Sequence, residues 1–249
     1  MDVLADGLDS RELADLNALL FDLDDTLLDY SGEAARCWSE ACAAVAGPAG
    51  VDPATLGQAI RDVSTVFWGD PVRHRIERTD MMEAWRKIVE GALDRCGGAR
   101  DGLALRVAED FAARRRQTWI LFADAVPTLD HLRARGVALG LLTNGDALMQ
   151  REKIARWDLA RYFDVIVIEG EFGCGKPDAR VFHHALEALR VRPADTWMVG
   201  DNLVWDILGA KQVGVRAAWL DREGRGLPPD APAVPDRILG SLTELTTLA

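Results

Sequence analysis

Groups able to do chemistry gather at a few places in the chain, beside short apolar runs. They are carboxylates, hydroxyls, amides and one lysine: Asp22, Asp24, Asp25, Thr26, Thr143, Asn144, Lys176, Asp201, Asn202 and Asp206. Carboxylates brought together repel one another and raise one another's pKa unless a cation lies among them. An all-oxygen set with room for water suits Mg²⁺, which also accepts a phosphate oxygen as a ligand. The residue types therefore favour a magnesium site that binds a phosphate.

Groups suited to the phosphate itself stand further along the chain. Lys176 offers positive charge, Thr143 a hydroxyl, and Asn144 with Gly145 backbone N–H groups at a helix start. A carboxylate can attack phosphorus and form an acyl phosphate, which divides transfer to water into two steps. A second carboxylate two residues later can protonate the leaving alcohol and then take a proton from the attacking water. Asp22 and Asp24 have this spacing, provided that the strand ends at Asp22 and the chain turns there.

The elements that would position these groups alternate along the chain. Short apolar runs typical of buried strands lie at 18–23, 137–142, 165–168, 196–200 and 215–220. Helical patterns lie between them, at 147–157, 178–190 and 204–214. Strands that alternate with helices of this length predict βαβ units and a parallel sheet. Because ligands bind at the carboxyl ends of such strands, we expect the polar groups to share one edge of the sheet.

A long helical stretch interrupts this alternation after the first strand. Residues 31–120 contain Ala-rich and Arg-rich segments, turn signals at 47–53, 68–71 and 96–102, and no run typical of a strand. We therefore predict a discontinuous α/β core formed by 18–30 and 121–249, with 31–120 as an inserted helical module. Residues 1–17 would form an acidic leader. The Pro-rich segment 224–236 is predicted to be a surface loop before a last short helix.

Composition and charge narrow the function classes. With 49% hydrophobic residues, the 249-residue chain can build a sizeable core. Its formal charge of −11 argues against nucleic acid and against an anionic membrane surface as partners. No apolar stretch approaches the ~20 residues that span a bilayer. The cysteines, Cys37, Cys42, Cys96 and Cys174, show neither a CxxC pair nor zinc spacing, so we expect reduced thiols and a cytoplasmic protein.

Four motifs together resemble a known family. They are DLDDT at 22–26, LLTNG at 141–145, GKPD at 175–178 and GDNLVWD at 200–206. In this order they resemble the motifs of the haloacid dehalogenase-like (HAD) hydrolase superfamily. The position of the insert is similar to that in its helical-cap (C1) phosphatase subfamily. The resemblance covers residues 18–222 and implies a Rossmann-like parallel sheet core flanked by helices, with the inserted module acting as an all-helical cap domain.

The resemblance also implies roles for the acidic residues. Asp22 would be the nucleophile that becomes the aspartyl phosphate, and Asp24 the general acid and base. Mg²⁺ would be held by the carboxylates of Asp22 and Asp201 and by the backbone carbonyl of Asp24. Asp206 would support the metal site through water or Lys176.

The phosphoryl group would be held by Thr143, Asn144 and Lys176. The implied function is a Mg²⁺-dependent phosphohydrolase that cleaves a small phosphomonoester, such as a sugar phosphate or a nucleotide, through an aspartyl-phosphate intermediate. Its partner would be a small phosphorylated metabolite, and either a monomer or a homodimer is compatible with the sequence.

Other reactions and functions compete with hydrolysis. The family's dehalogenases lack the second aspartate, because no leaving alcohol needs a proton, and its mutases usually carry DxDG instead of DLDDT. Hydrolysis is thus favoured over a phosphomutase or a dehalogenase. A phosphoaspartate-based signalling protein would also use an acidic cluster with Mg²⁺, but it would explain neither Asp24 nor the insert. A binding protein on an inactive scaffold is disfavoured because no catalytic position is missing.

Several residues keep two interpretations. Asp25 and Asp29 lie beside the acidic cluster, where loop aspartates commonly cap turns. The basic run of the helical module could meet an anionic substrate or form a solvated helix face; it comprises Arg73, His74, Arg75 and Arg78. Tryptophans of the module are expected in its core, although one could stack on a substrate; they are Trp38, Trp68, Trp85 and Trp119. The identity of the phosphomonoester stays open.

Overall fold

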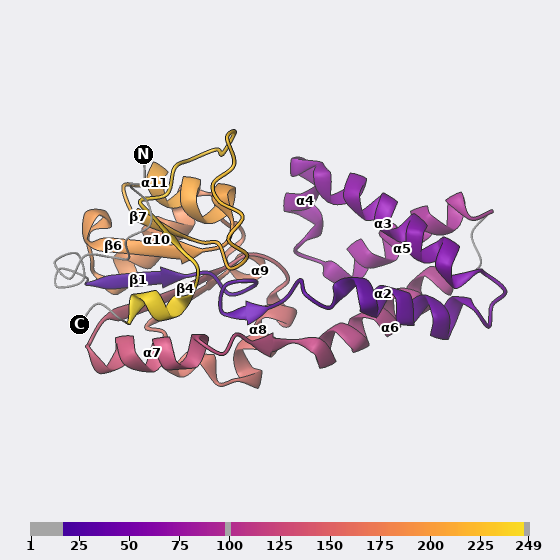
Figure 1. The fold of residues 1–249 in the computed structure, drawn as a ribbon, viewed down its shortest axis with the longest axis horizontal. Coiled ribbons are helices and arrows are strands. Elements are labelled where there is room, and N and C mark those ends of the chain that lie inside the picture. Colours follow the sequence, from indigo (N-terminus) through magenta and orange to yellow (C-terminus); the bar gives the residue numbers. More distant parts are fainter. Residues whose placement is uncertain (1–16, 98–100, 247–249) are drawn as a thin grey trace. The chain divides into compact units, whose positions relative to one another are not determined.

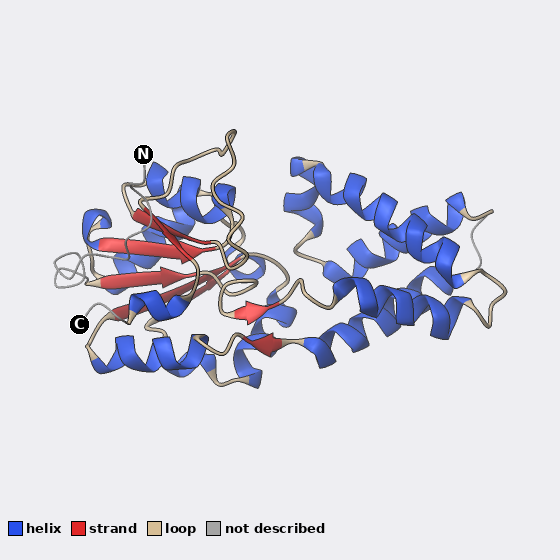
Figure 2. Cartoon of the chain, in the orientation of Figure 1, coloured by secondary structure: helices blue, strands red, loops and turns tan. Residues whose placement is uncertain are grey.

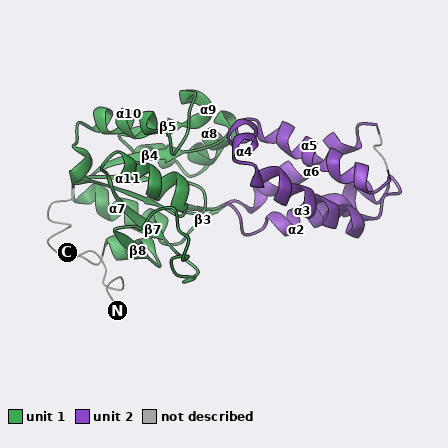
Figure 3. Ribbon diagram, turned by 90° about the horizontal axis from the view of Figure 1, so that it is seen from above, with its two compact units in different colours: residues 1–29, 120–249 green, residues 30–119 purple. Residues whose placement is uncertain are grey.

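The computed structural model describes residues 17–97 and 101–246. Residues 1–16 of the predicted acidic leader lie outside this range. The chain forms two compact units, which Figure 3 shows in different colours. Of the described residues, one unit comprises 17–29 and those from Ile120 onward, and the other comprises those between Tyr30 and Trp119. Each unit boundary thus lies one residue before the boundary predicted from the sequence.

A parallel sheet of six strands, in the order β5-β4-β1-β6-β7-β8, forms the centre of the larger unit. The strands are β1 Ala18–Phe21, β4 Ala138–Thr143, β5 Val165–Ile168, β6 Thr196–Gly200, β7 Arg216–Leu220 and β8 Arg237–Leu239. Every residue of β1 is fully buried, as expected for a central strand of a parallel sheet. All pairings are parallel, so the carboxyl ends meet at one edge, as the arrowheads in Figure 2 show.

Helices flank this sheet (Figure 1), which confirms the predicted Rossmann-like α/β fold. The α-helices of this unit are α7 Ala125–Ala134, α8 Ala147–Arg156, α9 Glu169–Phe172, α10 Ala179–Leu189 and α11 Gly209–Gln212. Short 3₁₀ segments lie at Leu159–Tyr162, Pro193–Asp195 and Leu242–Leu245, and a π-helical segment lies at Leu203–Leu208. Side chains cap the N-termini of two helical segments. The Asp146 side chain accepts a hydrogen bond from the N–H of Met149 in α8, and the Asn202 side chain accepts hydrogen bonds from the N–H groups of Val204 and Trp205 in the π-helical segment.

Three short strands were not predicted. β8 follows the predicted loop 224–236 and forms the edge of the sheet beside β7. β2, Leu28–Asp29, and β3, Ile120–Leu121, form a separate antiparallel pair at the two chain crossings between the units. Each of these strands has only two or three residues, too few to produce a recognisable pattern of alternating side chains. Pairing with a neighbour distant in sequence defines them instead.

Within the described residues of the smaller unit, every regular element is helical, and short loops join them. Its elements are α2 Ala34–Ala41, a π-helical segment Cys42–Ala46, α3 Pro53–Gly69, α4 Pro71–Glu77, α5 Met81–Arg95 and α6 Leu103–Thr118. Asp52 and Asp70 cap α3 and α4, and each is followed by a proline in the first turn. Trp85, Phe111 and Trp119 are buried, and Trp38 stacks on Phe111 with 3.6 Å between ring centroids. Trp85 also meets the Phe111 ring edge-on, so Trp38, Phe111 and Trp85 form a local aromatic cluster.

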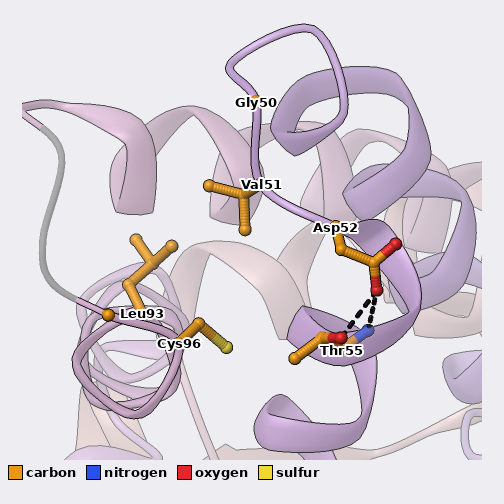
Figure 4. A pocket seen from close by; sticks show the side chains of 7 residues that line it. Gly50, Val51, Asp52, Thr55, Leu93 and Cys96 are labelled. Carbon is orange, nitrogen blue, oxygen red and sulfur yellow. Dashed lines mark hydrogen bonds between the residues drawn. The ribbon is translucent and has the colours of Figure 1, made fainter.

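A small cavity lies within the helical unit, and none of the predicted site residues lines it. Its volume is about 150 Å³, and Figure 4 shows its lining. The lining residues are Gly50, Val51, Asp52, Thr55, Leu93, Cys96 and Gly97. The Asp52 carboxylate there accepts hydrogen bonds from the backbone N–H and hydroxyl of Thr55, at 2.8 and 2.6 Å, and so serves as a helix cap. Within the described part of the chain, no helix is both long and apolar enough to cross a membrane.

Candidate active site

The carboxyl ends of three neighbouring strands bring the predicted residues together. Asp22 directly follows β1, Thr143 is the last residue of β4, and Asp201 directly follows β6. Because β1 lies between β4 and β6, these positions share the same edge of the sheet. The N–H of Asp22 still donates to the Val199 carbonyl, at 3.0 Å. Asp22 is therefore held by the sheet although the strand has ended.

A tight loop after Asp22 turns the chain. Asp25 adopts a left-handed backbone conformation with φ of 60°, and the N–H groups of Leu27 and Leu28 both donate to the Leu23 carbonyl. An aspartate tolerates this conformation better than most residues. The loop directs the Asp24 carboxylate toward α8, where it meets Gln150 and Lys153. Asp22 and Asp24 thus contact different cations, although only one residue separates them.

Three carboxylates form a cluster at this edge. Asp22, Asp201 and Asp206 each offer an oxygen, and these oxygens lie within 4.8 Å of one another. Burial raises the pKa of Asp22 to about 7, since the lowering effect of Lys176 only partly offsets burial and the charge of Asp206. Burial, together with the charges of Asp22, Asp206 and Asp25, raises the pKa of Asp201 to about 9. The cluster thus lacks enough positive charge to ionise fully near neutral pH.

Lys176 supplies the positive charge inside the cluster. Its ammonium donates to Asp22 Oδ1 and Asp206 Oδ1, both at 2.6 Å, and the side chain is only 1% exposed. Burial alone would lower the pKa of Lys176, but Asp206 and Asp22 outweigh it and raise the pKa. One ammonium therefore faces three carboxylates, and a bound divalent cation would complete the charge balance.

Asp206 is fixed from two sides. One carboxylate oxygen pairs with Lys176, and the other accepts the N–H of Asn202 at 3.0 Å. Gly200, at the end of β6, makes room for it, because a Cβ there would lie 2.2 Å from Asp206 Oδ2. Both carboxylate oxygens of Asp206 thus accept hydrogen bonds from the protein. Asp201 is held through its backbone instead, because its carbonyl accepts a hydrogen bond from Trp219 Nε1–H of β7 at 2.7 Å.

Asn144 joins the segment after β4 to the lysine segment. Its side-chain oxygen accepts the Lys176 N–H at 2.8 Å, and its side-chain nitrogen donates to the Lys176 carbonyl at 2.9 Å. The N–H of Gly145 donates to Glu169 Oε2 at 2.9 Å. Gly175 is packed so closely that a Cβ would lie 2.5 Å from Asn144 Oδ1. Asn144 and Lys176, both predicted to bind phosphate, are therefore held in one network, and Gln150 links Thr143 to it.

Sequence reasoning missed three buried residues beside this network: Gln150, Lys153 and Glu169. Gln150 Nε2 lies 2.9 Å from Asp24 Oδ2 and 3.1 Å from the Asn144 carbonyl, and also contacts the Thr143 hydroxyl. Lys153 Nζ lies 2.8 Å from both oxygens of Asp24. A polar pair spaced by three on a helix lies on one face, which is the signal that the sequence offered.

The remaining candidates lie in other places. Asp25 borders the cluster and adds to the repulsion that raises the pKa of Asp201, while Asp29 belongs to β2. In the helical unit, Arg73 lies over the Phe67 ring at 5.2 Å, and His74 packs edge-on to Trp68. Burial, then the charge of Arg78, lowers the pKa of His74. The basic run therefore packs partly on its own aromatic neighbours.

Comparisons with known proteins identify the family of the chain. A family model described as haloacid dehalogenase-like hydrolase matches residues 16–214. A phosphoserine phosphatase of Thermus thermophilus is 36% identical, over 92% of this chain and 98% of the relative. An N-acylneuraminate-9-phosphatase of Mus musculus is 33% identical, over 95% and 94%. A crystal structure of a 2-haloacid dehalogenase from Pseudomonas syringae pv. Tomato is similar with a TM-score of 0.64 and 28% identity, covering 94% of this chain and 97% of that one.

The sheet, the acidic edge and the buried lysine all belong to the Rossmann-like core. The chain belongs to the haloacid dehalogenase-like hydrolases, since the family model covers most of its length. Both curated relatives named above are phosphatases, and the chain is an enzyme of this class, a hydrolase of phosphoric monoester bonds. The family resemblance inferred from the four motifs is thereby confirmed.

Proposed function

We propose that this chain is a Mg²⁺-dependent phosphohydrolase that cleaves a small phosphomonoester through an aspartyl phosphate on Asp22. The observation that carries the proposal is the cluster of Asp22, Asp201 and Asp206, whose oxygens lie within 4.8 Å of one another around one buried ammonium. Such a cluster is unfavourable by itself, because burial and mutual repulsion oppose ionisation of each carboxylate. A hard divalent cation with oxygen ligands removes that penalty.

The donor set fits Mg²⁺. Asp22 and Asp201 would hold the ion with their carboxylates and Asp24 with its backbone carbonyl, while Asp206 supports the site through Lys176. Both oxygens of Asp206 already accept protein hydrogen bonds, which favours this supporting role. When bound, Mg²⁺ would neutralise charge on the transferring phosphoryl group. Lys176 and the Thr143 hydroxyl would bind that group from the protein side, with the backbone of Asn144 assisting.

Two steps follow from the spacing of Asp22 and Asp24. A carboxylate oxygen of Asp22 attacks phosphorus while the bond to the leaving oxygen breaks, and the Asp24 carboxyl gives its proton to that oxygen. In the second step Asp24 takes a proton from water, whose oxygen attacks phosphorus. The phosphorus–oxygen bond to Asp22 then breaks, and inorganic phosphate and the free carboxylate result. Positioning and charge neutralisation supply most of the catalysis in such transfers.

The proposed substrate class is a small phosphorylated metabolite. It is inferred from the substrates in the names of the two relatives. They act on phosphoserine and on an N-acylneuraminate 9-phosphate according to their names, and both are alkyl phosphomonoesters with a carboxylate. We therefore propose an alkyl phosphomonoester, with these two compounds as the first to test. Sugar phosphates and nucleotides complete the range.

A phosphomonoester panel with Mg²⁺, scored by kcat/KM, tests the proposal. Asp22→Asn should abolish turnover, and EDTA should do so reversibly. Asp62→Asn makes the same chemical change on the exposed face of α3 and should keep the wild-type rate. Wild-type activity of Asp22→Asn would contradict the mechanism. Isomerised rather than hydrolysed product, or release of halide from a 2-haloacid, would instead indicate a phosphomutase or a dehalogenase.

A further inference from the structure

Helix α8 buries two polar residues, Gln150 and Lys153, next to Met149 and Ile154. Lys153 is 1% exposed and Gln150 is 2% exposed, whereas Leu148 of the same helix is 83% exposed. Burying a lysine ammonium and an amide costs free energy unless their partners compensate. A leucine at the position of Lys153 would avoid this cost of burial. The buried face of α8 is therefore arranged for the contacts that its polar residues make.

Those contacts meet at Asp24. Lys153 Nζ lies 2.8 Å from each oxygen of the Asp24 carboxylate, so that it binds both oxygens together. Gln150 Nε2 lies 2.9 Å from Asp24 Oδ2. The carboxylate is thus held by two donors that stand one helical turn apart on a rigid element. This restrains Asp24, which lies in the tight loop after β1 and whose side chain is 23% exposed.

The same amide also reaches the phosphate side of the site. Gln150 Nε2 contacts the Thr143 hydroxyl and lies 3.1 Å from the Asn144 carbonyl. An amide group has two hydrogens, so it can serve two of these three acceptors at a time. Asp24 and Thr143 therefore flank a single side chain. This arrangement places the Asp24 carboxylate next to the hydroxyl that, in the proposed function, binds the transferring phosphoryl group.

We propose that Lys153 and Gln150 are positioning residues that hold the Asp24 carboxylate beside the phosphoryl site for proton transfer. The inference rests on the proposed function, in which Asp24 serves the leaving oxygen and then the attacking water. Both residues act through Asp24, and neither gives or takes the transferred proton itself. Their contribution is to fix the direction from which the proton is given and taken, which a freely rotating aspartate on a loop would not maintain.

This role predicts a dependence on the leaving group. An alkyl alkoxide needs a proton as it departs, whereas p-nitrophenolate leaves readily without one. Replacing Lys153 should thus affect the first step for an alkyl phosphate much more than for p-nitrophenyl phosphate. Attack of water on the shared phosphoenzyme needs Asp24 with either substrate. The second step should therefore slow equally for both.

The test uses full-length Lys153→Met with Mg²⁺, p-nitrophenyl phosphate and the best alkyl phosphate of the panel. For the alkyl substrate, kcat/KM should fall about 10- to 100-fold, within the range of general acid–base catalysis. For p-nitrophenyl phosphate, kcat/KM should stay within about threefold while kcat falls about tenfold or more, and nitrophenolate should appear in a burst equal to the enzyme concentration. The control variant Arg151→Met removes a neighbouring cation of α8 that pairs with Glu171. It should leave kcat and kcat/KM unchanged for both substrates.

Gln150→Leu is the second variant and removes no charge. It should show the same difference between the two substrates to a smaller extent, with kcat/KM for the alkyl substrate falling about fivefold. An equal loss for both substrates without a burst would overturn the proposal, because a purely structural role has no leaving-group dependence. Unchanged or faster turnover would also overturn it. The proposed function itself would fail if the wild-type enzyme hydrolysed neither phosphate or if Asp22→Asn kept full activity. These two results differ from those that would overturn only the positioning role of Lys153 and Gln150.

Discussion

Metal binding should depend steeply on pH, because the carboxylates of the cluster hold protons when the metal is absent. The pKa of Asp22 is raised to about 7 and that of Asp201 to about 9, each chiefly by burial. A cation that requires both groups ionised must displace these protons. About two protons should leave per ion bound at pH 6, and about one at pH 8. Lys176, whose pKa is raised, stays protonated throughout this range.

The magnitude follows from the same two values. Between pH 6 and pH 8, ionisation of Asp22 contributes about one decade of affinity and ionisation of Asp201 about two. The apparent affinity for Mg²⁺ should thus rise about a thousandfold, or about 4 kcal/mol, over this interval. Stability should follow the opposite course without metal. A carboxyl with a raised folded-state pKa stabilises the fold at low pH, so the metal-free protein should lose stability as the pH rises from about 4 toward 9.

Isothermal titration calorimetry in two buffers of different ionisation enthalpy measures the proton release directly. The matched variant is Asp201→Asn, which should release about one proton fewer at pH 6 and bind Mg²⁺ more weakly. Thermal melts should show a gain in Tm on adding Mg²⁺ that grows with pH. An affinity independent of pH between 6 and 8, with no proton release, would refute the reasoning, because it would mean that the carboxylates are already ionised without the metal.

Three further predictions concern packing and structure around the site. Gly200→Ala should lower kcat/KM at least about tenfold with an unchanged circular dichroism spectrum, since its Cβ would lie 2.2 Å from Asp206 Oδ2; wild-type kinetics would contradict this. Phe111→Ala should destabilise the helical unit by about 3–5 kcal/mol in urea unfolding, because Phe111 is 3% exposed and stacks on Trp38; a loss below about 1 kcal/mol would count against this packing. Asp124→Ala should cost about 1–3 kcal/mol at pH 7, since Asp124 accepts hydrogen bonds from Arg222, Ser241 and the Leu242 N–H. Burial tends to raise the pKa of Asp124, but these donors outweigh it and lower the pKa below its usual 3.8, so the difference should shrink as the pH falls through and below this value; an equal difference in urea unfolding at pH 3 would contradict it.

The apolar runs allowed most of the sheet to be predicted. β5 and β6 have the predicted bounds, and β1 and β4 lie within two residues of theirs. A central parallel strand is buried on both faces, so it appears as a continuous apolar run that local sequence reveals. The short strands β2, β3 and β8 carry no such signal. They form because a partner strand from another part of the sequence lies beside them: β3 pairs with β2, and β7 pairs with β8.

Gln150 and Lys153 show the same limit within the site. In isolation, a helical segment with Arg151, Glu152 and Lys153 suggests a solvated face. Only the packing of α8 against the loop after β1 buries Lys153 and gives it Asp24 as a partner, 129 positions away in sequence. Residue types alone cannot distinguish a buried lysine from an exposed one, because the difference lies in the surroundings.

The sequence by itself determined the kinds of groups available and their order: two aspartates after the first strand, a threonine and an asparagine after a later one, a lysine, and two more aspartates. It also determined the family, because four motifs in order are specific. Only the tertiary structure decided which charges face one another. Asp22 and Asp201 lie far apart in the chain yet within 4.8 Å of each other through their oxygens, while Asp24, two residues from Asp22, pairs with a different lysine. Charge interactions depend on distance in space and on burial, and both are properties of the fold.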